Sequence, residues 1–448
     1  MRSLVLTLFL LTGCASSETH TLLSRYAMYG FDGVALVSKH GRVLTHDAFG
    51  RATVHQRYDA GSIMKTFVAA AILQLEAQGR LRTSDTVAGP ITIHQLLTHT
   101  SGLPLDPPNS TDDLFDAAAK AKLVAAPGER YSYSNFGYGL LLGIVERASG
   151  QPFAGYARAH LLEPAGMRES RFWTEPALPG EAIAAAFTGN SDEELEPAEP
   201  LVRNGPNAPM WGGKYTFGAA GILTTAADLE RWWRWLTKHP ELQRYGWNTP
   251  PNKIYRGGLV RASFISMLAY YREHDAVLIY LINRNTGWHL PIEKNVERIL
   301  ARQPYVLPPP VVRGKDVLPI GDSQQALSLL WSLTPEQRAA AANAETLVKQ
   351  QMSEPFEILG TTRHPSSARN LQTFVRTGDT IQRVITDGTK VLAVAKGVPP
   401  SAMRRFRPTG NGTYASYDPA TDSVITARKT DAGYVLENAA GERVVLKR

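Results

Sequence analysis

The order of strand-like and helix-like segments in the N-terminal two thirds of the chain constrains the fold more than any other feature. Residues 31–50 alternate between apolar and polar positions around Gly41, which predicts two strands joined by a tight turn. A long helical block follows, beginning with apolar residues at helical spacing over 62–79. Strand-like segments return at 264–271 and 276–283. We therefore predict an α+β fold in which both ends of this region contribute to one antiparallel sheet, with a helical subdomain beside it.

Composition excludes several classes of protein. The 448 residues are 43% hydrophobic and 20% charged, as in a globular chain with a buried core, so a largely disordered protein is excluded. Mean hydropathy is −0.20 and the N-terminus holds the one long apolar run, which excludes a polytopic membrane protein. The net charge of +7 comes from dispersed basic residues, so no nucleic-acid partner is implied. A single cysteine, Cys14, leaves no internal disulfide and no cysteine-based metal site.

The N-terminus has the features of an export signal. Arg2 precedes an apolar run that is too short to span a bilayer, so we interpret residues 1–13 as a signal peptide. The sole cysteine follows in the sequence Leu-Thr-Gly-Cys14, which resembles a bacterial lipobox, whose cysteine is lipidated. An ordinary signal peptide that ends near a cysteine is the simpler alternative. The lipobox predicts an exported protein, lipid-anchored to the periplasmic or cell-surface face of a bacterial membrane, with 14–25 as a polar tether.

A change in composition separates a second unit. Residues 304–321 contain three consecutive prolines and several valines, which predicts a stiff linker between a first domain over 26–303 and an accessory domain over 322–448. The accessory domain begins with a predicted helix over 334–351, which starts with a capping-box pattern. Strand-like runs then dominate, with a typical Asp-Gly hairpin turn at 387–388. We predict a strand-rich α+β accessory domain.

Two short motifs place groups for nucleophilic catalysis. Ser62 and Lys65 are three residues apart at the start of the first predicted helix, so the lysine amine can reach the serine hydroxyl. Serine needs a base to become a good nucleophile, and a lysine with a lowered pKa helps to supply one. About 70 residues later, Tyr133-Ser-Asn135 offers a phenol that can relay a proton and an amide that can hold a substrate carbonyl.

A third segment adds a strand edge. Tyr255-Arg256-Gly257-Gly258 precedes a predicted strand, and an extended strand beside the serine can pair with a substrate backbone. A backbone N–H of this segment, together with that of Ser62, can form an oxyanion hole.

Together these segments resemble the serine beta-lactamase and penicillin-binding-protein superfamily, in its class C-like branch that also holds esterases and D-amino-acid peptidases. The resemblance covers about 31–300. The matching segments are FDGVALVSKHGRVLTHDAFG, SIMKTFVAAAILQLEAQGRL, ITIHQLLTHTSGLP, YSYSNFGYGLLLGIVERASGQPF, LLEPAGM, FGAAGILTTAADLERW and ASFISMLAYYREHDAVLIYLINRN. It implies the beta-lactamase/transpeptidase-like fold for residues 26–303.

The resemblance also implies a role for each motif residue. Ser62 would be the acylated nucleophile, tuned by Lys65. Tyr133 would act as general base for acylation and then pass a proton to the leaving group. Asn135 would position the substrate, and the N–H groups of Ser62 and Gly258 would stabilise the oxyanion. The partner would be a small ester, amide or peptide substrate, hydrolysed through an acyl-enzyme, and no metal or organic cofactor is implied.

The third motif departs from the family pattern. It usually begins with Lys or His, and here Tyr255 stands at that position. Arg256 is adjacent, but successive strand residues face opposite sides, so we do not expect it to substitute simply for the missing cation. A cation there helps to bind a substrate carboxylate, so a neutral acyl ester fits better. The stretch between Trp235 and Tyr255 also looks short, which predicts an open cleft or a missing specificity loop.

Three functions remain open at this stage. The leading hypothesis is a serine hydrolase of esterase type. The second is a D-amino-acid peptidase or beta-lactamase acting on cell-wall-like amides, and the third is a non-catalytic binding protein that retains the fold. His99 belongs to a turn and Asp59 to a loop, and we expect structural roles for both.

Overall fold

The computed structural model describes most of the chain as two compact units. One unit comprises 32–188 and 196–285, and the other comprises the N-terminal segment through 31, residues 189–195 and 286–448. The described residues are 15–107, 113–184, 187–188, 196–197, 214–260, 264–283, 287–317, 329, 335–352, 355–363, 370–378, 380–396, 405–419 and 421–447. The predicted signal peptide and Cys14 lie outside them.

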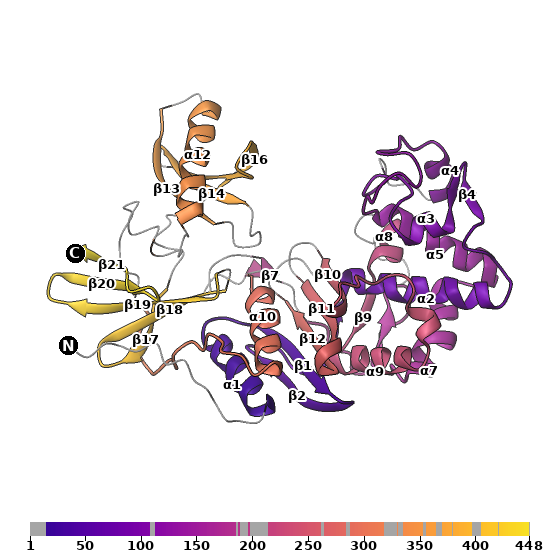
Figure 1. The fold of residues 1–448 in the computed structure, drawn as a ribbon, viewed down its shortest axis with the longest axis horizontal. Helices are drawn as coiled ribbons and strands as arrows, with labels where there is room; N and C mark the ends of the chain where they lie inside the picture. Colours follow the sequence, from indigo (N-terminus) through magenta and orange to yellow (C-terminus); the bar gives the residue numbers. More distant parts are fainter. Residues whose placement is uncertain are drawn as a thin grey trace. The chain divides into compact units, whose positions relative to one another are not determined.

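A five-stranded antiparallel sheet organises the unit formed by 32–188 and 196–285 (Figure 1). Its strands are β10 (Lys253–Val260), β11 (Phe264–Tyr271), β12 (Ala276–Ile282), β1 (Gly33–Lys39) and β2 (Arg42–Phe49), in that order across the sheet. β1 pairs with β12 along its whole length, so segments about 240 residues apart close one sheet. The predicted fold is confirmed. His40 and Gly41 turn the β1–β2 hairpin with φ of 49° and 72°, left-handed values that glycine adopts readily.

Helices and short strands inserted between β2 and β10 form the rest of this unit. The helices are η1 (Gly61–Ile63), α2 (Met64–Ala77), α3 (Ile93–Leu97), α4 (Leu114–Ala119), α5 (Asn135–Ser149), α6 (Phe153–Ala157), η2 (Arg158–Leu162), α7 (Glu163–Ala165), α8 (Lys214–Ala219), α9 (Ala226–Thr237) and η3 (Pro240–Gln243), with η4 (Arg272–His274) between β11 and β12. The strands are β3 (Tyr58–Asp59), β4 (Thr86–Ala88), β5 (Ile91–Thr92), β6 (Arg171–Phe172), β7 (Phe187–Thr188), β8 (Glu196–Pro197) and β9 (Ile222–Thr224). α2 is apolar on nearly every side, so it is buried as the central helix of this unit.

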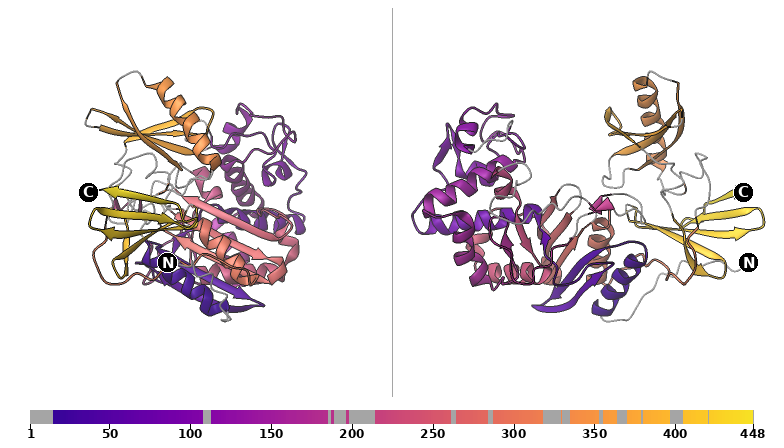
Figure 2. Two further views of the ribbon diagram at one scale, coloured as in Figure 1. Left: turned by 60° about the vertical axis from the view of Figure 1, so that its left-hand side comes forward. Right: turned by 180° about the vertical axis from the view of Figure 1, so that it is seen from behind.

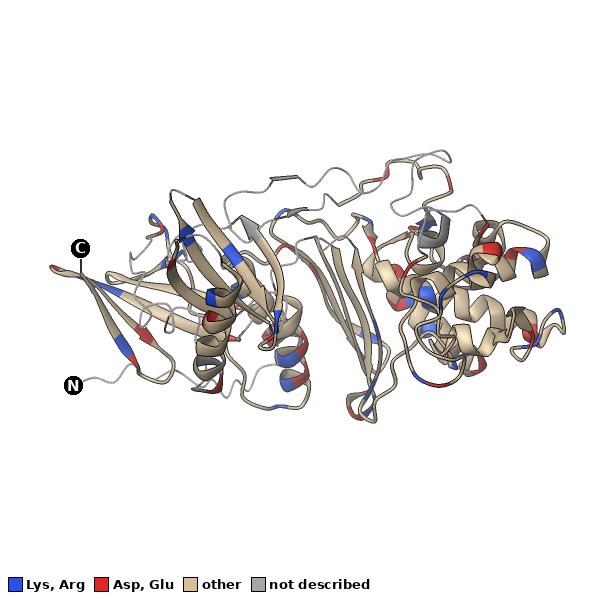
Figure 3. Ribbon diagram, turned by 90° about the horizontal axis from the view of Figure 1, so that it is seen from above, with Lys and Arg blue, Asp and Glu red and all other residues tan. Residues whose placement is uncertain are grey.

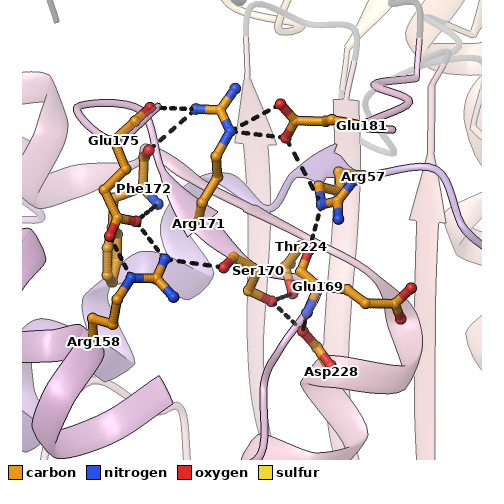
Figure 4. A network of polar contacts seen from close by, with 10 residues as sticks. All are labelled: Arg57, Arg158, Glu169, Ser170, Arg171, Phe172, Glu175, Glu181, Thr224 and Asp228. Atoms are coloured by element: carbon orange, nitrogen blue, oxygen red, sulfur yellow. Dashed lines mark hydrogen bonds and ion pairs between the residues drawn. The ribbon is translucent and has the colours of Figure 1, made fainter. Parts of the chain in front are cut away.

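A network of buried charges stabilises the small sheet β3–β9–β6 (Figure 4). The guanidinium of Arg171 binds the carboxylate of Glu181 at 2.8 Å, with the two side chains only 1% and 4% exposed. Nearby, Ser170 Oγ lies 2.7 Å from both Thr224 Oγ1 and Asp228 Oδ2. Buried charges need partners, and here the bonded groups come from β6 with the residues on either side of it, from β9 and from α9. The network therefore holds together the strands that lead into the segments around Ser62 and Ala219.

The other unit begins with a helix where the sequence suggested a tether. α1 spans Ala15–Met28, and Leu22, Leu23 and Tyr26 are fully buried on it. The tether interpretation of 15–25 is therefore wrong for the described residues, because apolar side chains toward the end of this polar segment provide a helix face that packs. α1 contacts α10 (His289–Leu300), and the ring of Tyr26 lies 5.2 Å from that of Trp288.

The C-terminal region contains two antiparallel sheets (Figure 2). The first consists of β13 (Glu357–Arg363), β14 (Leu371–Thr377), β15 (Thr380–Thr386) and β16 (Val391–Lys396), and α12 (Pro335–Gln351) packs on it through Val348. The second consists of β17 (Arg407–Gly410), β18 (Thr413–Asp418), β19 (Ser423–Thr430), β20 (Gly433–Asn438) and β21 (Arg443–Lys447). The expected strand-rich α+β region is confirmed.

The proline-rich segment makes specific contacts with elements of its own unit. The carbonyl oxygens of Pro308 and Pro309 accept hydrogen bonds from Arg25 and Tyr29. Further along, the N–H of Val312 donates to the carbonyl of Pro408, and Val317 pairs with Phe406. These bonds connect α1 and the β17–β21 sheet to the segment that the sequence indicated as a linker.

Charged residues of both signs are interspersed along the ribbons of both units (Figure 3). Within the residues described, no helix combines the length and apolarity needed to cross a bilayer.

We expect Arg171→Met to lower the free energy of unfolding of the unit formed by 32–188 and 196–285 by about 3–5 kcal/mol, because Glu181 would lose its main partner while remaining buried. The measurement is urea denaturation followed by tryptophan fluorescence. Arg244→Met is the matched control, since Arg244 and Glu76 form a more exposed pair, 52% and 26%, whose loss should cost about 1 kcal/mol or less. Equal small losses in the two variants would contradict a stabilising role for the buried network.

Candidate active site

Ser62 lies at the turn between β3 and the central helix α2. It belongs to η1, and its neighbours Gly61 and Ile63 are buried while Ser62 itself is partly exposed. Gly61 has φ of 51°, and its N–H donates to the carboxylate of Asp59 at 2.8 Å. Burial raises the pKa of Asp59 to about 7. As expected, Asp59 has a structural role: it holds the turn that presents the Ser62 hydroxyl.

Lys65 is fully buried one turn into the helix, directly behind Ser62. Its Nζ lies 3.0 Å from each of three oxygens: Ser62 Oγ, Asn135 Oδ1 and the carbonyl oxygen of Ala219. Burial lowers the pKa of Lys65 well below its usual value, and the nearby Arg256 guanidinium lowers it further. A neutral amine has two N–H donors and one lone pair. As an ammonium group, Lys65 donates to all three oxygens. In the neutral form, the amide and carbonyl oxygens, which can only accept, take its two N–H donors and leave the lone pair for the hydroxyl of Ser62.

The carbonyl of Ala219 reaches Lys65 because α8 packs very closely on α5. A Cβ placed on Gly218 would lie 2.2 Å from the carbonyl oxygen of Tyr138. Glycine at this position therefore allows the two helices to approach. Sequence reasoning did not include this acceptor, since a backbone carbonyl has no residue-type signal.

Tyr133 brings a second oxygen to the nucleophile. Its Oη lies 2.8 Å from Ser62 Oγ, and it accepts a hydrogen bond from Arg256 Nη2 at 3.0 Å. The ring packs against the imidazole of His99, with ring centroids 4.4 Å apart. His99 Nδ1 accepts from the N–H of Ser134, and burial lowers the pKa of His99 to about 3, so this side chain is neutral. His99 thus has the structural role expected for it.

Asn135 is the first residue of α5, and Ser134 caps that helix. The amide oxygen of Asn135 accepts from Lys65, and its Nδ2 donates to Asp106 Oδ1 at 3.1 Å. These two contacts fix which end of the amide faces the lysine. The sequence motifs did not point to Asp106, which lies in the loop between α3 and α4.

Arg256, and not Tyr255, is the residue of the third segment that reaches the site. Its Nε donates to the carbonyl oxygen of Ser62 at 3.0 Å, and its guanidinium is almost completely buried. Tyr255 instead contacts the ammonium group of Lys253. We placed Tyr255 at the position of the motif's cation and did not expect Arg256 to substitute simply for it, and the structure contradicts both. The side chains of Tyr255 and Arg256 do lie on opposite faces of the strand, as expected, but the side chain on the face of Ser62 is that of Arg256.

The backbone of β10 also corrects the expected oxyanion donor. β10 is the edge strand, and Tyr255 bonds with both its N–H and C=O to Asn248 on the side away from β11. Backbone direction alternates along an antiparallel strand, so Leu259 shares the orientation of Tyr255, while Gly258 faces β11. The nitrogen of Leu259 also lies beside Gly61. The N–H that points toward the Ser62 turn therefore belongs to Leu259, and the assignment to Gly258 is wrong.

Gly258 has a different role, which is to let β10 approach the nucleophile. A Cβ at this position would lie 2.1 Å from the carbonyl oxygen of Ala60 and 2.5 Å from Ser266 Oγ. At Gly257, on the other face of the strand, the nearest atom to a Cβ would be the flexible Met267 Cε at 3.4 Å. Neither glycine offers a side chain to a substrate.

The described residues contain no group of three or more His, Cys, Asp and Glu side chains placed to hold a metal ion.

Comparisons with known proteins identify the family of the chain. The family model for beta-lactamase matches residues 22–302, more than half of the chain. Penicillin-binding protein 4* of Bacillus subtilis is 26% identical over 347 residues, covering 62% of this chain and 74% of that protein. Protein flp of Staphylococcus aureus is 28% identical over 238 residues, covering 46% of this chain. The chain spans less than half of the length of protein flp, 45%.

Solved structures show the same fold. FmtA from Staphylococcus aureus matches with a TM-score of 0.54 at 16% identity, over 67% of this chain and 92% of that one. A class C beta-lactamase matches with a TM-score of 0.53 at 18% identity, over 64% of this chain and 95% of that one. The chain belongs to the beta-lactamase family, within the superfamily of serine beta-lactamases and penicillin-binding proteins. The resemblance stated from the sequence motifs is confirmed.

The two neighbouring glycines of β10 provide a matched test of the site geometry. We expect Gly258→Ala to lower the free energy of unfolding by about 1–3 kcal/mol and to slow the reaction of Ser62 with a fluorophosphonate, because the new methyl group pushes the strand away from Ala60. Gly257→Ala should lose less than about 1 kcal/mol. The measurements are urea denaturation and the rate of adduct formation by mass spectrometry. A Gly258→Ala variant that behaves like Gly257→Ala would contradict the close approach.

Proposed function

We propose that this chain is a serine hydrolase that acts through an acyl-enzyme on Ser62, with esters as its substrates. One observation supports this most strongly: Ser62 Oγ lies within hydrogen-bond distance of both a buried lysine amine and a tyrosine hydroxyl, at 3.0 and 2.8 Å. A serine so placed has acceptors for its proton, which is what nucleophilic attack requires. The assembled site also argues against a binding protein that merely retains the fold.

Acylation begins when Ser62 Oγ attacks the substrate carbonyl. The hydroxyl proton moves to the Lys65–Tyr133 pair: Lys65 Nζ and Tyr133 Oη both lie within hydrogen-bond distance of Ser62 Oγ, and the lowered pKa of Lys65 makes its neutral form, which can accept the proton, more accessible. The N–H groups of Ser62 and Leu259 stabilise the oxyanion of the tetrahedral intermediate. Tyr133 then gives its proton to the leaving alcohol and takes one back from Lys65, and the positive charge of Arg256 stabilises the negative charge that the phenol oxygen carries in between.

Deacylation reverses the roles. Water attacks the acyl-enzyme carbonyl, the same lysine–tyrosine pair takes a proton from this water, and Ser62 leaves with that proton. The products are a carboxylic acid and an alcohol, and the site returns to its starting protonation state.

Two features of the third segment favour esters over substrates with a free carboxylate. Arg256 is only 5% exposed, and it donates to Ser62 O and Tyr133 Oη, so its charge is used within the site. Gly257 offers no hydroxyl group to a substrate. Cleavage of D-amino-acid peptides or beta-lactams is the second candidate, which the similarity to penicillin-binding protein 4* supports.

We also propose that the protein is exported and lipid-anchored through Cys14. The support is the sequence alone: an apolar N-terminal run followed by Leu-Thr-Gly-Cys14. Because the chain is helical from Ala15 onward, a lipid on Cys14 would leave almost no flexible spacer before α1.

Labelling of Ser62 tests the hydrolase proposal. We expect a fluorophosphonate to add once to the wild type and not to Ser62→Ala, by intact-protein mass. Because the pKa of Lys65 is lowered, labelling should persist at neutral pH and fall as acid protonates the amine. Lys65→Arg should label about 10²–10⁴-fold more slowly, since arginine stays protonated. If the folded wild-type protein is not labelled, the hydrolase proposal is refuted. If the wild-type protein turns over beta-lactams but not esters, the second candidate is favoured.

Membrane fractionation tests the anchor. Expressed in bacteria, the wild-type protein should be found with membranes and be released by detergent. Cys14→Ala should move to the soluble exported fraction or remain as unprocessed precursor. Equal distribution of the two proteins, together with a wild-type intact mass that shows no lipid, would exclude lipidation at Cys14.

A further inference from the structure

We infer that the site selects esters that carry a positive charge, and that Asp106 is the residue that recognises this charge. The inference rests on the proposed hydrolase function and adds the substrate class to it. It starts from the position of one exposed carboxylate that the family motifs did not indicate.

The backbone holds Asp106 at the edge of the site. The carbonyl of the preceding residue, Leu105, accepts hydrogen bonds from the N–H groups of Asn135 and Phe136 at 2.7 and 3.1 Å. The loop is thereby fixed to the N-terminus of α5. The Asp106 side chain then accepts from Asn135 Nδ2 at 3.1 Å. A carboxylate has about four acceptor positions, so this one bond leaves capacity for a ligand.

Among the described charged groups that act on Lys65, Asp106 is the one that faces solvent. Of the ionised groups that act on Lys65, Arg256 disfavours the charged form of the lysine and Asp106 favours it. Arg256 and Lys65 are both buried, at 5% and 0% exposure, and are bonded to site atoms, whereas Asp106 is exposed. A substrate that enters from solvent therefore meets a negative charge first.

Exposed apolar side chains belong to the same segments. Leu105 adjoins Asp106, Tyr131 is two residues before Tyr133, and Leu259 provides the proposed oxyanion N–H; these three are 51%, 61% and 58% exposed. Large apolar side chains with this exposure are suited to contact the apolar body of a ligand. The chemistry that matches the segments is an amphipathic ester with an ammonium group within reach of Asp106.

The test compares esters of the same shape and different charge. One pair is the p-nitrophenyl esters of an acyl chain that ends in trimethylammonium or in tert-butyl. The other pair places the same two groups on the alcohol, as acetate esters of choline and of 3,3-dimethylbutanol. In one or both pairs we expect wild-type kcat/KM to favour the cation about fivefold at low salt, and less at high salt, as for an exposed ion pair.

Asp106→Asn should bring the cation-to-neutral ratio close to one. Asp116→Asn is the matched control, since it removes the same charge from an exposed aspartate that pairs with Lys120 on α4, and it should keep the wild-type ratio. If Asp106 only orients Asn135, Asp106→Asn would slow all esters equally and keep the ratio, which would overturn the inference. Wild type that cleaves neutral and cationic esters equally in both pairs would also overturn it while leaving the hydrolase proposal intact. Failure to cleave any ester would refute the ester proposal itself.

Discussion

The site depends on the burial of one lysine. Lys65 lies within α2, the central helix, and its amine is removed from water, which lowers its pKa. Burial of an amine is costly unless its hydrogen bonds are satisfied. Here three segments that are distant in sequence provide oxygens at 3.0 Å: Ser62, Asn135 and Ala219. The close α5–α8 packing and the polar network around β6 and β9 hold the segments that carry these oxygens in place.

The second constraint is the approach of the edge strand β10 to the serine turn. Ser266 Oγ on β11 donates to the carbonyl of Ala60 at 2.7 Å, and Gly258 leaves room for that carbonyl against the strand. This contact sets the position of the Leu259 N–H relative to Ser62. It also lets Arg256 reach both the Ser62 carbonyl and Tyr133. One close backbone contact thus positions the proposed oxyanion donor and the cation of the site.

The C-terminal region shares a core with α10, which lies within the family match, and with the part of α1 that does. Tyr26 of α1 and Trp288 lie inside the matched residues 22–302, and both stack on Tyr417 of β18, at 5.2 and 5.5 Å between ring centroids. Asn295 of α10 donates to Asp422 at 2.9 Å in the same cluster. The β17–β21 sheet is therefore packed on α1 and α10, and a domain boundary drawn at the proline-rich segment would cut through contacts among these elements.

The sequence by itself determined the main sheet, the central helix and the Ser62–Lys65–Tyr133–Asn135 group. Apolar periodicity and motif spacing are local properties of the sequence, so they can be recognised without knowledge of the tertiary contacts. It also led us to expect a strand-rich C-terminal region. Only the tertiary structure decided that Arg256 and the Leu259 N–H face Ser62. Which alternate residues of the edge strand β10 point to each side is fixed by its register with β11, and the sequence of β10 alone does not show that register. Likewise, residues 15–25 form a helix because distant aromatic side chains bury its apolar face, and Asp106 joins the site through a loop whose position no local pattern encodes.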